Sequence, residues 1–495
     1  MKKKLRPGDL RNLNRARFEK LSSAKLVEMC VNLHALAVEQ AERLSGNSSN
    51  SSKPPSSDNP YRRNPLIDAG NGVSGVSTKP SDAPASDSPR RSAGHQMGAP
   101  GKWRSSPLIA TEKVDHLPLC CASCGQSYPA IMERRCVSAH YVMDLERRDD
   151  GIGVTCRLHR YFAIGCSCGH ATQSAPGRGV SSKIEGRCRN LTLTERCLVG
   201  PALATFIAGL SVRFRMSRGL VEEFLHDWLG LDLAKGTICR CIREIGLACE
   251  PVADALLTEI RASDILHPDE TPWHQKGALR WLWVATNATV AVFHIGTREK
   301  TELLELIGES FLGWLVTDGY GAYRSHKKRQ RCLAHLIRKA VALQEGLYAD
   351  AARFGDWIAR ELRSLISGVA EDAGSKTLDL IIGRLKKACL LNREACVEKA
   401  RALAREILND WDAVIAFVKN SNLPPTNNEA ERALRHAVIS RRISYGTRTD
   451  EGSRGYAATL SVIETCRKRS IVPWKFITEL LATARRGDEK PILAA

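Results

Sequence analysis

The stretch that decides the fold of this chain lies between residues 267 and 320. It contains four segments in order: HPDETPW at 267–273, RWLWVATN at 280–287, TVAVFHI at 289–295 and WLVTDGY at 314–320. Their β-branched and aromatic residues, with turn residues at the segment ends, are typical of strands. The stretch therefore predicts a sheet around which the rest of the chain is organised.

Two aspartates of this sheet are candidate metal ligands. Asp269 lies in the first predicted strand, and Asp318 lies at the end of a later one, directly before Gly319. A carboxylate at a strand end points into a cleft more readily than one in mid-strand, which is typical of nuclease-type sheets. A turn at Asp318-Gly319 with a solvated Asp269 is the alternative. Far downstream, PPTNNEAERALR at 424–435 supplies a third acid, Glu431. Three carboxylates in one cleft would suit magnesium or manganese, hard ions that prefer oxygen ligands.

The segment that carries Glu431 is predicted to be a helix with one apolar stripe. Glu429 and Glu431 flank this stripe on opposite sides at similar angles, so helix geometry does not choose between them. Glu431 shares its side with Arg435 and Arg442, cations suited to holding a scissile phosphate. Alternatively, with Asn428 as the N-cap, Glu431 would stand at the third helical position and cap the helix.

Composition indicates a protein that binds a polyanion. Lys and Arg number 73 against 54 Asp and Glu, a formal net charge of +19 over 495 residues, which is room for about three domains. The 17 cysteines are scattered and odd in number, which predicts reduced thiols in a cytoplasmic protein. The basic N-terminus does not continue into an apolar segment, so no signal peptide is expected. No apolar run reaches the roughly 18 residues of a membrane helix.

Residues 111–190 are dense in cysteine and predict a small zinc-binding module. Cys121 and Cys124 form a CxxCG knuckle, and Cys166 and Cys168 would supply the second pair of a structural, four-ligand zinc site. The alternative is a set of ordinary free cysteines. The CxC spacing of the second pair leaves room for other ligands, namely Cys156, His159 and His170.

Residues 191–260 are predicted to be helical and to bind DNA. An amphipathic helix at 217–229, a glycine turn at Gly230 and a basic helix at 234–245 have the order of a helix-turn-helix. A plain helical hairpin is the alternative. In the DNA-binding interpretation, the side chains that face DNA are Lys235, Thr237, Arg240 and Arg243.

The remaining segments frame these regions. Residues 1–45 contain a helix with near-heptad apolar spacing, which would either pair with a second copy or fold onto the body. Residues 46–110 are polar and proline-bearing, and predict a flexible tether. A helical tract at about 330–420 interrupts the core of 261–445, and residues 446–495 form a C-terminal helical region.

Motifs along most of the chain resemble the insertion sequence 66 family of bacterial transposases. The three segments that resemble its acidic triad are DET at 269–271, TDGY at 317–320 and NNEAER at 427–432. Three further strings are similar to family segments: NSSNSSKPPSSD at 47–58, CLAHLIR at 332–338 and SVIETCRKRSIVPW at 461–474. Leu333 replaces a family tryptophan, and Cys166-Ser-Cys168 replaces a family CxxC.

The resemblance implies a multidomain α+β protein with an RNase H-like α/β catalytic core and a large helical insertion. It implies a DDE transposase in which Asp269, Asp318 and Glu431 hold two metal ions, since the family's glutamate directly precedes an arginine. Transposon ends and target DNA would be the partners, with homo-oligomers and small companion proteins encoded by the same element. A metal-dependent nuclease or resolvase, and a catalytically inactive DNA-binding protein, are the alternatives.

Overall fold

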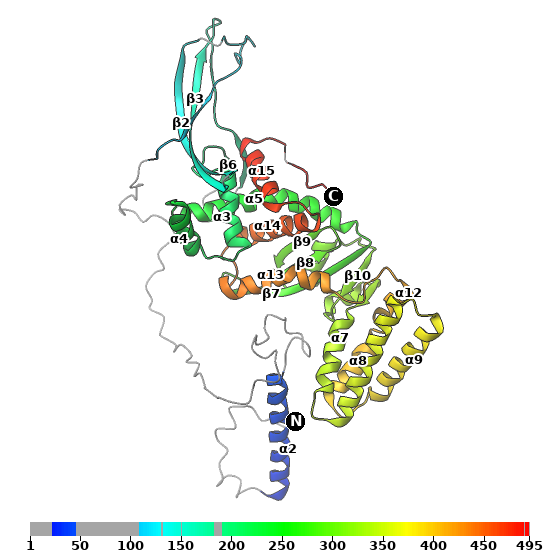
Figure 1. The fold of residues 1–495 in the computed structure, drawn as a ribbon. Helices are drawn as coiled ribbons and strands as arrows, with labels where there is room; N and C mark the ends of the chain where they lie inside the picture. The colour runs from blue at the N-terminus through cyan, green and yellow to red at the C-terminus, as the bar shows by residue number, and fades with distance from the viewer. Residues whose placement is uncertain are drawn as a thin grey trace. The chain divides into compact units, whose positions relative to one another are not determined.

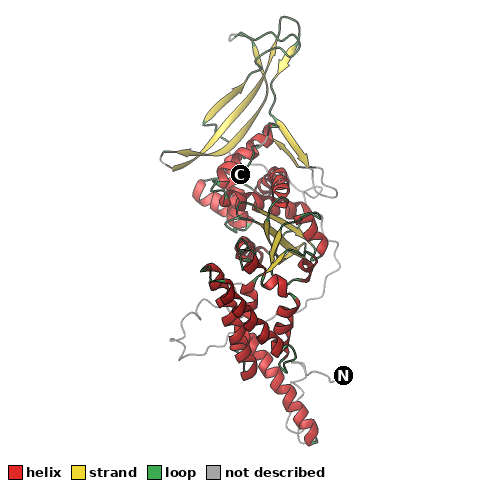
Figure 2. Cartoon of the chain, turned by 90° about the vertical axis from the view of Figure 1, so that its right-hand side faces the viewer, coloured by secondary structure: helices red, strands yellow, loops and turns green. Residues whose placement is uncertain are grey.

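The computed structural model describes residues 22–45, 108–129, 132–149, 151–182, 191–489 and 491–494. It divides into two compact units: a smaller one within 59–142 and 155–173, and a larger one that holds the rest. Most of the predicted tether at 46–110 lies outside the described residues. Helices prevail in the larger unit, and strands build the smaller one (Figure 2).

A five-stranded mixed sheet lies at the centre of the larger unit (Figure 1). Its strands are β7 (Ile265–Gln275), β8 (Ala278–Thr286), β9 (Ala291–Gly296), β10 (Trp314–Thr317) and β11 (Arg329–Arg331). The order across the sheet is β11-β10-β7-β8-β9. β8 runs antiparallel to β7 and β9, whereas β10 is parallel to both β7 and β11. The strands predicted between 267 and 320 therefore form one sheet.

Helices pack on this sheet with their apolar residues. α13 (Asn428–Ser444) contacts β7 and β8, while α14 (Asp450–Lys468) contacts β9 and the long helix α5 (Lys235–Arg261). The apolar stripe predicted for α13 is buried, and it consists of Ala430, Ala433, Leu434, Ala437 and Val438. The helix expected at 234–245 continues to Arg261, because its apolar positions recur through Cys249, Val252, Leu256 and Ile260, all of which are buried.

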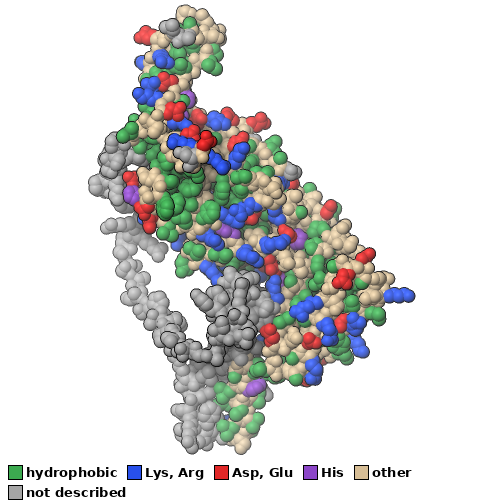
Figure 3. Space-filling view, in the orientation of Figure 1, with side chains coloured by type: hydrophobic (Ala, Val, Ile, Leu, Met, Phe, Trp, Pro, Cys, Tyr) green, Lys and Arg blue, Asp and Glu red, His purple; other side chains and the backbone are tan. Residues whose placement is uncertain are grey.

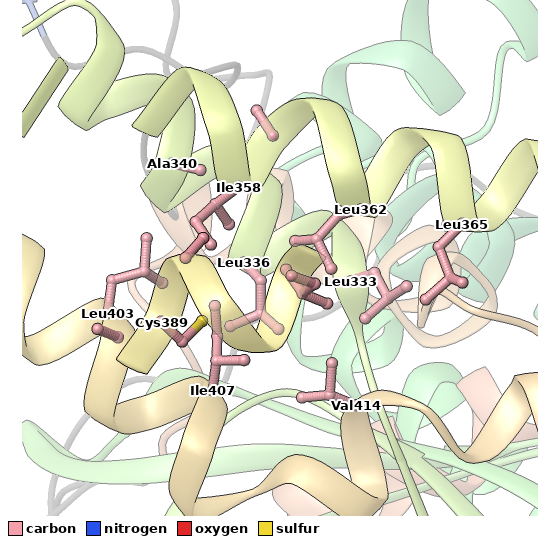
Figure 4. Packing of buried hydrophobic residues seen from close by; sticks show 14 of the residues in the cluster. Leu333, Leu336, Ala340, Ile358, Leu362, Leu365, Cys389, Leu403, Ile407 and Val414 are labelled. Carbon is pink, nitrogen blue, oxygen red and sulfur yellow. The ribbon is translucent and has the colours of Figure 1, made fainter. Parts of the chain in front are cut away.

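A helical insertion lies between β11 and α13, where the sequence predicts one. Its main helices are α7 (Leu333–Gln344), α8 (Ala349–Ala370), α9 (Ser375–Asn392) and α10 (Glu398–Asn409), followed by short helices α11 (Trp411–Val414) and α12 (Ala416–Lys419). They share a hydrophobic core that includes Leu336, Ile358, Leu362, Leu365 and Ile407 (Figure 4). Buried Arg329 and Arg331 of β11 bind Asp410 and Glu406, which joins the insertion to the sheet edge.

The remaining helices of the larger unit precede and follow the sheet. α3 (Pro201–Val212) and α4 (Arg218–Leu229) come before α5, and α15 (Pro473–Arg486) packs against α3 and α5. The N-terminal helix α2 covers Ser23–Ser45, and α6 (Lys300–Ile307) precedes β10. A hairpin of β5 (Arg178–Ser182) and β6 (Leu191–Thr194) lies on α15. As predicted, α4 ends in a turn at Gly230, whose φ is +63°.

The crossing of α5 and α14 depends on two glycines. A Cβ atom at Gly246 would lie 2.7 Å from the Cα of Gly455. We therefore expect Gly246→Ala to lower the free energy of unfolding by about 1–3 kcal/mol, because the helices must move apart. Gly236→Ala in the first turn of α5 is the control, since nothing lies within 4 Å of that position. The control is expected to raise stability by up to about 1 kcal/mol in urea unfolding; equal stability of the two variants would contradict this account.

The smaller unit is built on a β-sheet. β1 (Glu112–His116) is parallel to β3 (Gly151–Gly165), which also pairs with β2 (Arg134–Arg148) and the short β4 (Ala171–Gln173). Residues 143–154, at the joined ends of β2 and β3, are grouped with the larger unit. Two turns of this unit carry clustered cysteines: one holds Cys121 and Cys124, and the other holds Cys166 and Cys168.

Candidate functional site

Parallel pairing of β7 and β10 brings the two candidate aspartates to the same level of the sheet. Ile265 is opposite Trp314 and Leu266 is opposite Leu315. Asp269 and Asp318 each lie three residues beyond the second pair, Asp269 within β7 and Asp318 just after β10. Both side chains are half-buried.

Asn427 fastens the start of α13 to β7, and so places Glu431. Its side-chain Oδ1 lies 3.1 Å from His267 Nδ1, and its Nδ2 donates to the carbonyl of Pro268 at 2.9 Å. Its backbone N–H donates to the Sγ of Cys332, which directly precedes α7. Asn427 is 1% exposed, so it is a buried link between β7, α7 and α13.

The electrostatics of Asp269 show that acidic groups converge here. Burial raises the pKa of Asp269 well above its usual value, and the charges of Glu270, Asp318 and Glu431 raise it further. Burial and the charge of Arg338 lower the pKa of His335 in α7. The charges of Glu431 and Asp318 act on the same imidazole in the opposite direction. The charges of Asp318 and Glu431 therefore reach Asp269, and this repulsion would be relieved by a bound cation.

The two glutamates of α13 have different partners. Glu431 is 29% exposed and accepts from Arg338 Nη2 at 3.1 Å through each of its oxygens. Glu429 binds Lys468 of α14 at 3.0 Å and also Arg432. Burial raises the pKa of Glu429, but these two cations outweigh it and hold that pKa below its usual value. Glu431 thus lies with the aspartates, and Glu429 lies toward α14.

The helix start differs from the one expected. α13 begins at Asn428 with Asn427 as its N-cap residue, and no side chain caps it. The expected N-cap at Asn428 was one residue too late, because the carbonyl of Asn427 already accepts the first helical hydrogen bond, from the N–H of Glu431. The side chain of Asn427 binds β7 and is not free to cap the helix. The side chain of Glu431 binds Arg338 and does not bind the backbone at the start of the helix. The capping alternative therefore does not account for its position. Arg435 and Arg442 are exposed on the same helix.

A fourth carboxylate, Glu270, escaped the sequence analysis. Its side chain is 1% exposed, accepts from Tyr323 Oη at 2.6 Å and pairs with Arg298 at 2.8 Å. Burial and the charge of Asp318 raise the pKa of Glu270, although Tyr323 and Arg298 act to lower it. Arg298 also lies over the ring of Tyr320, 4.1 Å from its centroid. Adjacency to Asp269 is the only signal in the sequence, and strand alternation places neighbouring side chains on opposite faces of a sheet.

Gly319 and Arg331 connect the turn after Asp318 to the helical insertion. A Cβ atom at Gly319 would overlap the guanidinium of Arg331. Arg331 is 1% exposed, binds Glu406 of α10 and lies 3.6 Å from Asp410. Glycine in the TDGY segment is therefore a packing requirement, which holds the strand end against the insertion.

In the smaller unit, the four predicted cysteines come together. Their sulfur atoms all lie within 4.8 Å of one another, with Cys121 3.7 Å from Cys168 and Cys124 3.6 Å from Cys166. Each pair lies on a tight turn, which Gly125 (φ +74°) and Gly169 (φ +85°) complete. The alternative ligands Cys156, His159 and His170 are not part of this cluster.

The four thiols differ in acidity. The backbone N–H of Cys124 lowers the pKa of Cys121 to about 5, and that of Cys168 lowers the pKa of Cys166. The backbone N–H of Gln126 favours the Cys124 thiolate, but the neighbouring sulfurs outweigh it and raise that pKa to about 12. The backbone N–H of His170 favours the Cys168 thiolate, but Cys166, burial and Cys121 together outweigh it and raise the pKa of Cys168. Thiolates so placed suit a tetrahedral zinc ion.

The four side chains predicted to face DNA lie at the start of α5, and three have acidic partners. Lys235 lies 3.3 Å from Glu222, Arg240 pairs with buried Glu244 at 2.7 Å, and Arg243 pairs with Glu451 at 2.9 Å. Thr237 is half-buried. DNA contact through these residues stays a prediction. Among the described helices, none is both long and apolar enough to cross a membrane.

Comparison with known proteins identifies the family. Two uncharacterised proteins of Sinorhizobium fredii are similar to this chain. The protein y4hP is 36% identical over 336 residues, which cover 58% of this chain and 60% of y4hP. The protein y4qI is 22% identical over 330 residues, which cover 59% of this chain and 60% of y4qI. The chain thus spans about three fifths of these curated relatives. A family model described as "Transposase IS66 family" matches residues 196–455, more than half of the chain, and includes all three candidate acids. The chain therefore belongs to the IS66 family of transposases.

Proposed function

We propose that this protein is a DDE transposase, which cuts DNA strands at the ends of an insertion sequence and joins them to target DNA. The observation that carries this proposal is the convergence of Asp269, Asp318 and Glu431 from β7, β10 and α13. Three antiparallel strands followed by two parallel ones support an RNase H-like catalytic core.

The same residues fit magnesium or manganese. Carboxylate oxygens are the ligands these ions prefer, and the charges of Asp318 and Glu431 add to burial in raising the pKa of Asp269, which supports this assignment. We propose that all three acids hold metal, which when bound activates the attacking oxygen and stabilises the leaving one. Arg338 orients the carboxylate of Glu431, and Asn427 keeps α13 at a fixed position on β7. None of the three acids is assigned a nucleophilic role, so no covalent protein–DNA intermediate is expected.

Two accessory regions complete the proposal. Cys121, Cys124, Cys166 and Cys168 would hold a structural zinc ion, because four protein ligands leave no open position for chemistry. Helices α4 and α5 would read the element's ends as a helix-turn-helix. We further propose that the protein acts as a homo-oligomer, together with small companion proteins encoded by the same element.

A strand-cleavage and strand-joining assay tests the catalytic assignment. Labelled DNA carrying the element's own ends would be incubated with magnesium or manganese and with wild type, Glu431→Ala or Glu429→Ala. We expect Glu431→Ala to lose cleavage and joining by about 10⁴-fold. Glu429→Ala is the matched control on the same helix turn and should stay within tenfold of wild type, because Glu429 binds Lys468 and Arg432 instead.

Other outcomes lead to different functions. Cleavage without joining indicates a metal-dependent nuclease or resolvase. A wild-type protein that binds the ends but neither cuts nor joins, even with companion proteins, indicates a DNA-binding protein without catalytic activity. Loss of activity in Glu429→Ala but not in Glu431→Ala contradicts the assignment of the third acid.

A further inference from the structure

Three arginines lie near enough to His436 of α13 for their charges to act on its imidazole. Arg213 and Arg215 lie between α3 and α4, and Arg467 lies in the last turn of α14. His436 Nε2 donates to the carbonyl of Val212 at 2.8 Å, which ties α13 to the end of α3. Burial, together with the charges of all three arginines, lowers the pKa of His436 to about 4. The imidazole is therefore neutral at physiological pH and adds no charge to the arginine cluster.

The positive charge of this cluster is only partly neutralised. Glu464 binds Arg213, and it also acts on Arg467. Arg215 has no acidic partner within hydrogen-bonding distance among the residues that the structure describes. Figure 3 shows Lys and Arg side chains gathered on the face over α13 and α14. Such an excess of guanidinium groups attracts phosphate.

The backbone at Arg215 gives an independent reason to assign its side chain a function. Its φ is +64°, a left-handed conformation that glycine adopts most easily. The amides of Phe214 and Met216 bond back to Gly209 and Leu210, so this turn ends α3 in the way that usually employs glycine. An arginine here carries a conformational cost, and no ion pair with a described acidic residue offsets it.

The outer face of α13 connects the cluster with the acids. Successive helical residues turn by 100°, so His436 lies about 140° around the helix from Glu431. Between these two margins, the exposed side chains Arg432, Arg435 and Arg442 follow the same face. A DNA strand that crosses α13 would therefore meet arginines all the way from the acidic site to the cluster.

We propose that Arg213, Arg215 and Arg467 bind the phosphate backbone of DNA at the margin of α13 opposite Glu431. The proposal rests on the proposed function, because it takes DNA as the ligand of this face. Contacts on the far margin of α13 would set which phosphodiester of the strand reaches the acids. Because phosphates carry no sequence information, the cluster would contribute equally to the element's ends and to unrelated DNA.

Arg215→Gly is a sharp test because glycine suits the backbone and removes only the side chain. Fluorescence anisotropy would follow duplex binding between about 50 and 200 mM salt without magnesium or manganese. Each phosphate contact contributes about 0.9 to the slope of log affinity against log salt, and about eightfold to affinity at 0.1 M salt. We expect the magnitude of this negative slope to decrease by about 1 in Arg215→Gly. In the double variant Arg215→Gly/Arg467→Gln, we expect it to decrease by about 2.

Lys276→Gly is the matched control. Lys276 is an exposed cation with a φ of +53° in the turn between β7 and β8, outside the cluster. Thermal unfolding would verify that each variant folds, and Arg215→Gly should be at least as stable as wild type. An unchanged slope in Arg215→Gly, or an equal loss in Lys276→Gly, overturns the proposal. The binding assay does not require strand cleavage. If the wild-type protein never cuts DNA, the catalytic proposal is refuted, but the binding result can still be interpreted.

Discussion

Asp269→Asn is expected to abolish strand cleavage and, at the same time, to make the protein more stable. Asparagine keeps the size of the side chain but removes a negative charge that a metal ion needs, so we expect activity to fall on the order of 10⁴-fold. The same charge is half-buried beside Glu270, Asp318 and Glu431, which raises its pKa well above the usual value. Removing it relieves that repulsion.

The direction of the stability change follows from proton linkage. Below the ordinary aspartate pKa, both the native and the unfolded chain hold this proton, and the site has no effect. As pH rises above that value, the unfolded chain releases the proton while the native chain retains it, so native stability falls until the raised pKa is passed. The difference in melting temperature between Asp269→Asn and wild type should therefore grow from acid to neutral pH.

Two measurements check this prediction. Thermal unfolding across that pH range should give Asp269→Asn a melting temperature a few degrees higher at neutral pH. Magnesium or manganese should then raise the melting temperature of wild type, and raise that of Asp269→Asn much less. Asp264→Asn, an exposed acid just before β7, should match wild type in both. A variant that is less stable than wild type at neutral pH would contradict the account of Asp269.

Cys121→Ser is expected to abolish zinc binding at the proposed four-cysteine site and to unfold the smaller unit. Structural zinc in small domains contributes roughly 10–16 kcal/mol of binding free energy, more than a unit of this size gains from its own core. Cys121 has the thiol whose pKa is lowered to about 5, so its replacement removes the most acidic ligand. Metal content and the unfolding of the smaller unit would be measured side by side. Cys120→Ser, next to it and outside the cluster, should keep both.

Zinc binding should also release protons in a number that the structure predicts. Cys124 and Cys168 have raised pKa values and hold their protons at neutral pH in the metal-free protein, whereas Cys121 and Cys166 have lowered ones. At least two protons, those of Cys124 and Cys168, should therefore leave per zinc ion, because zinc binds thiolates. Calorimetry in buffers of different ionisation enthalpy counts them. Release of none would rule out a four-thiolate site.

The strands and the helix stripes were predictable because they depend on local order. Alternation and β-branched residues marked β7 to β10, and the spacing of apolar residues marked the buried side of α13. The end of α5 was missed because helical spacing has no sharp limit in the sequence, and its last buried residues pack only in the folded unit. The CASCG and CSCGH strings located the four cysteines, whose sulfurs the fold then brings together.

The sequence by itself determined which residue types are present and which of them share a strand or a helix face. Only the tertiary structure decided which partners they meet. Glu429 and Glu431 are equivalent on an isolated helix, and they become different because α7 brings Arg338 to one side and α14 brings Lys468 to the other. Contacts between segments far apart in the chain cannot be read from local periodicity, since packing chooses among faces that the sequence leaves alike.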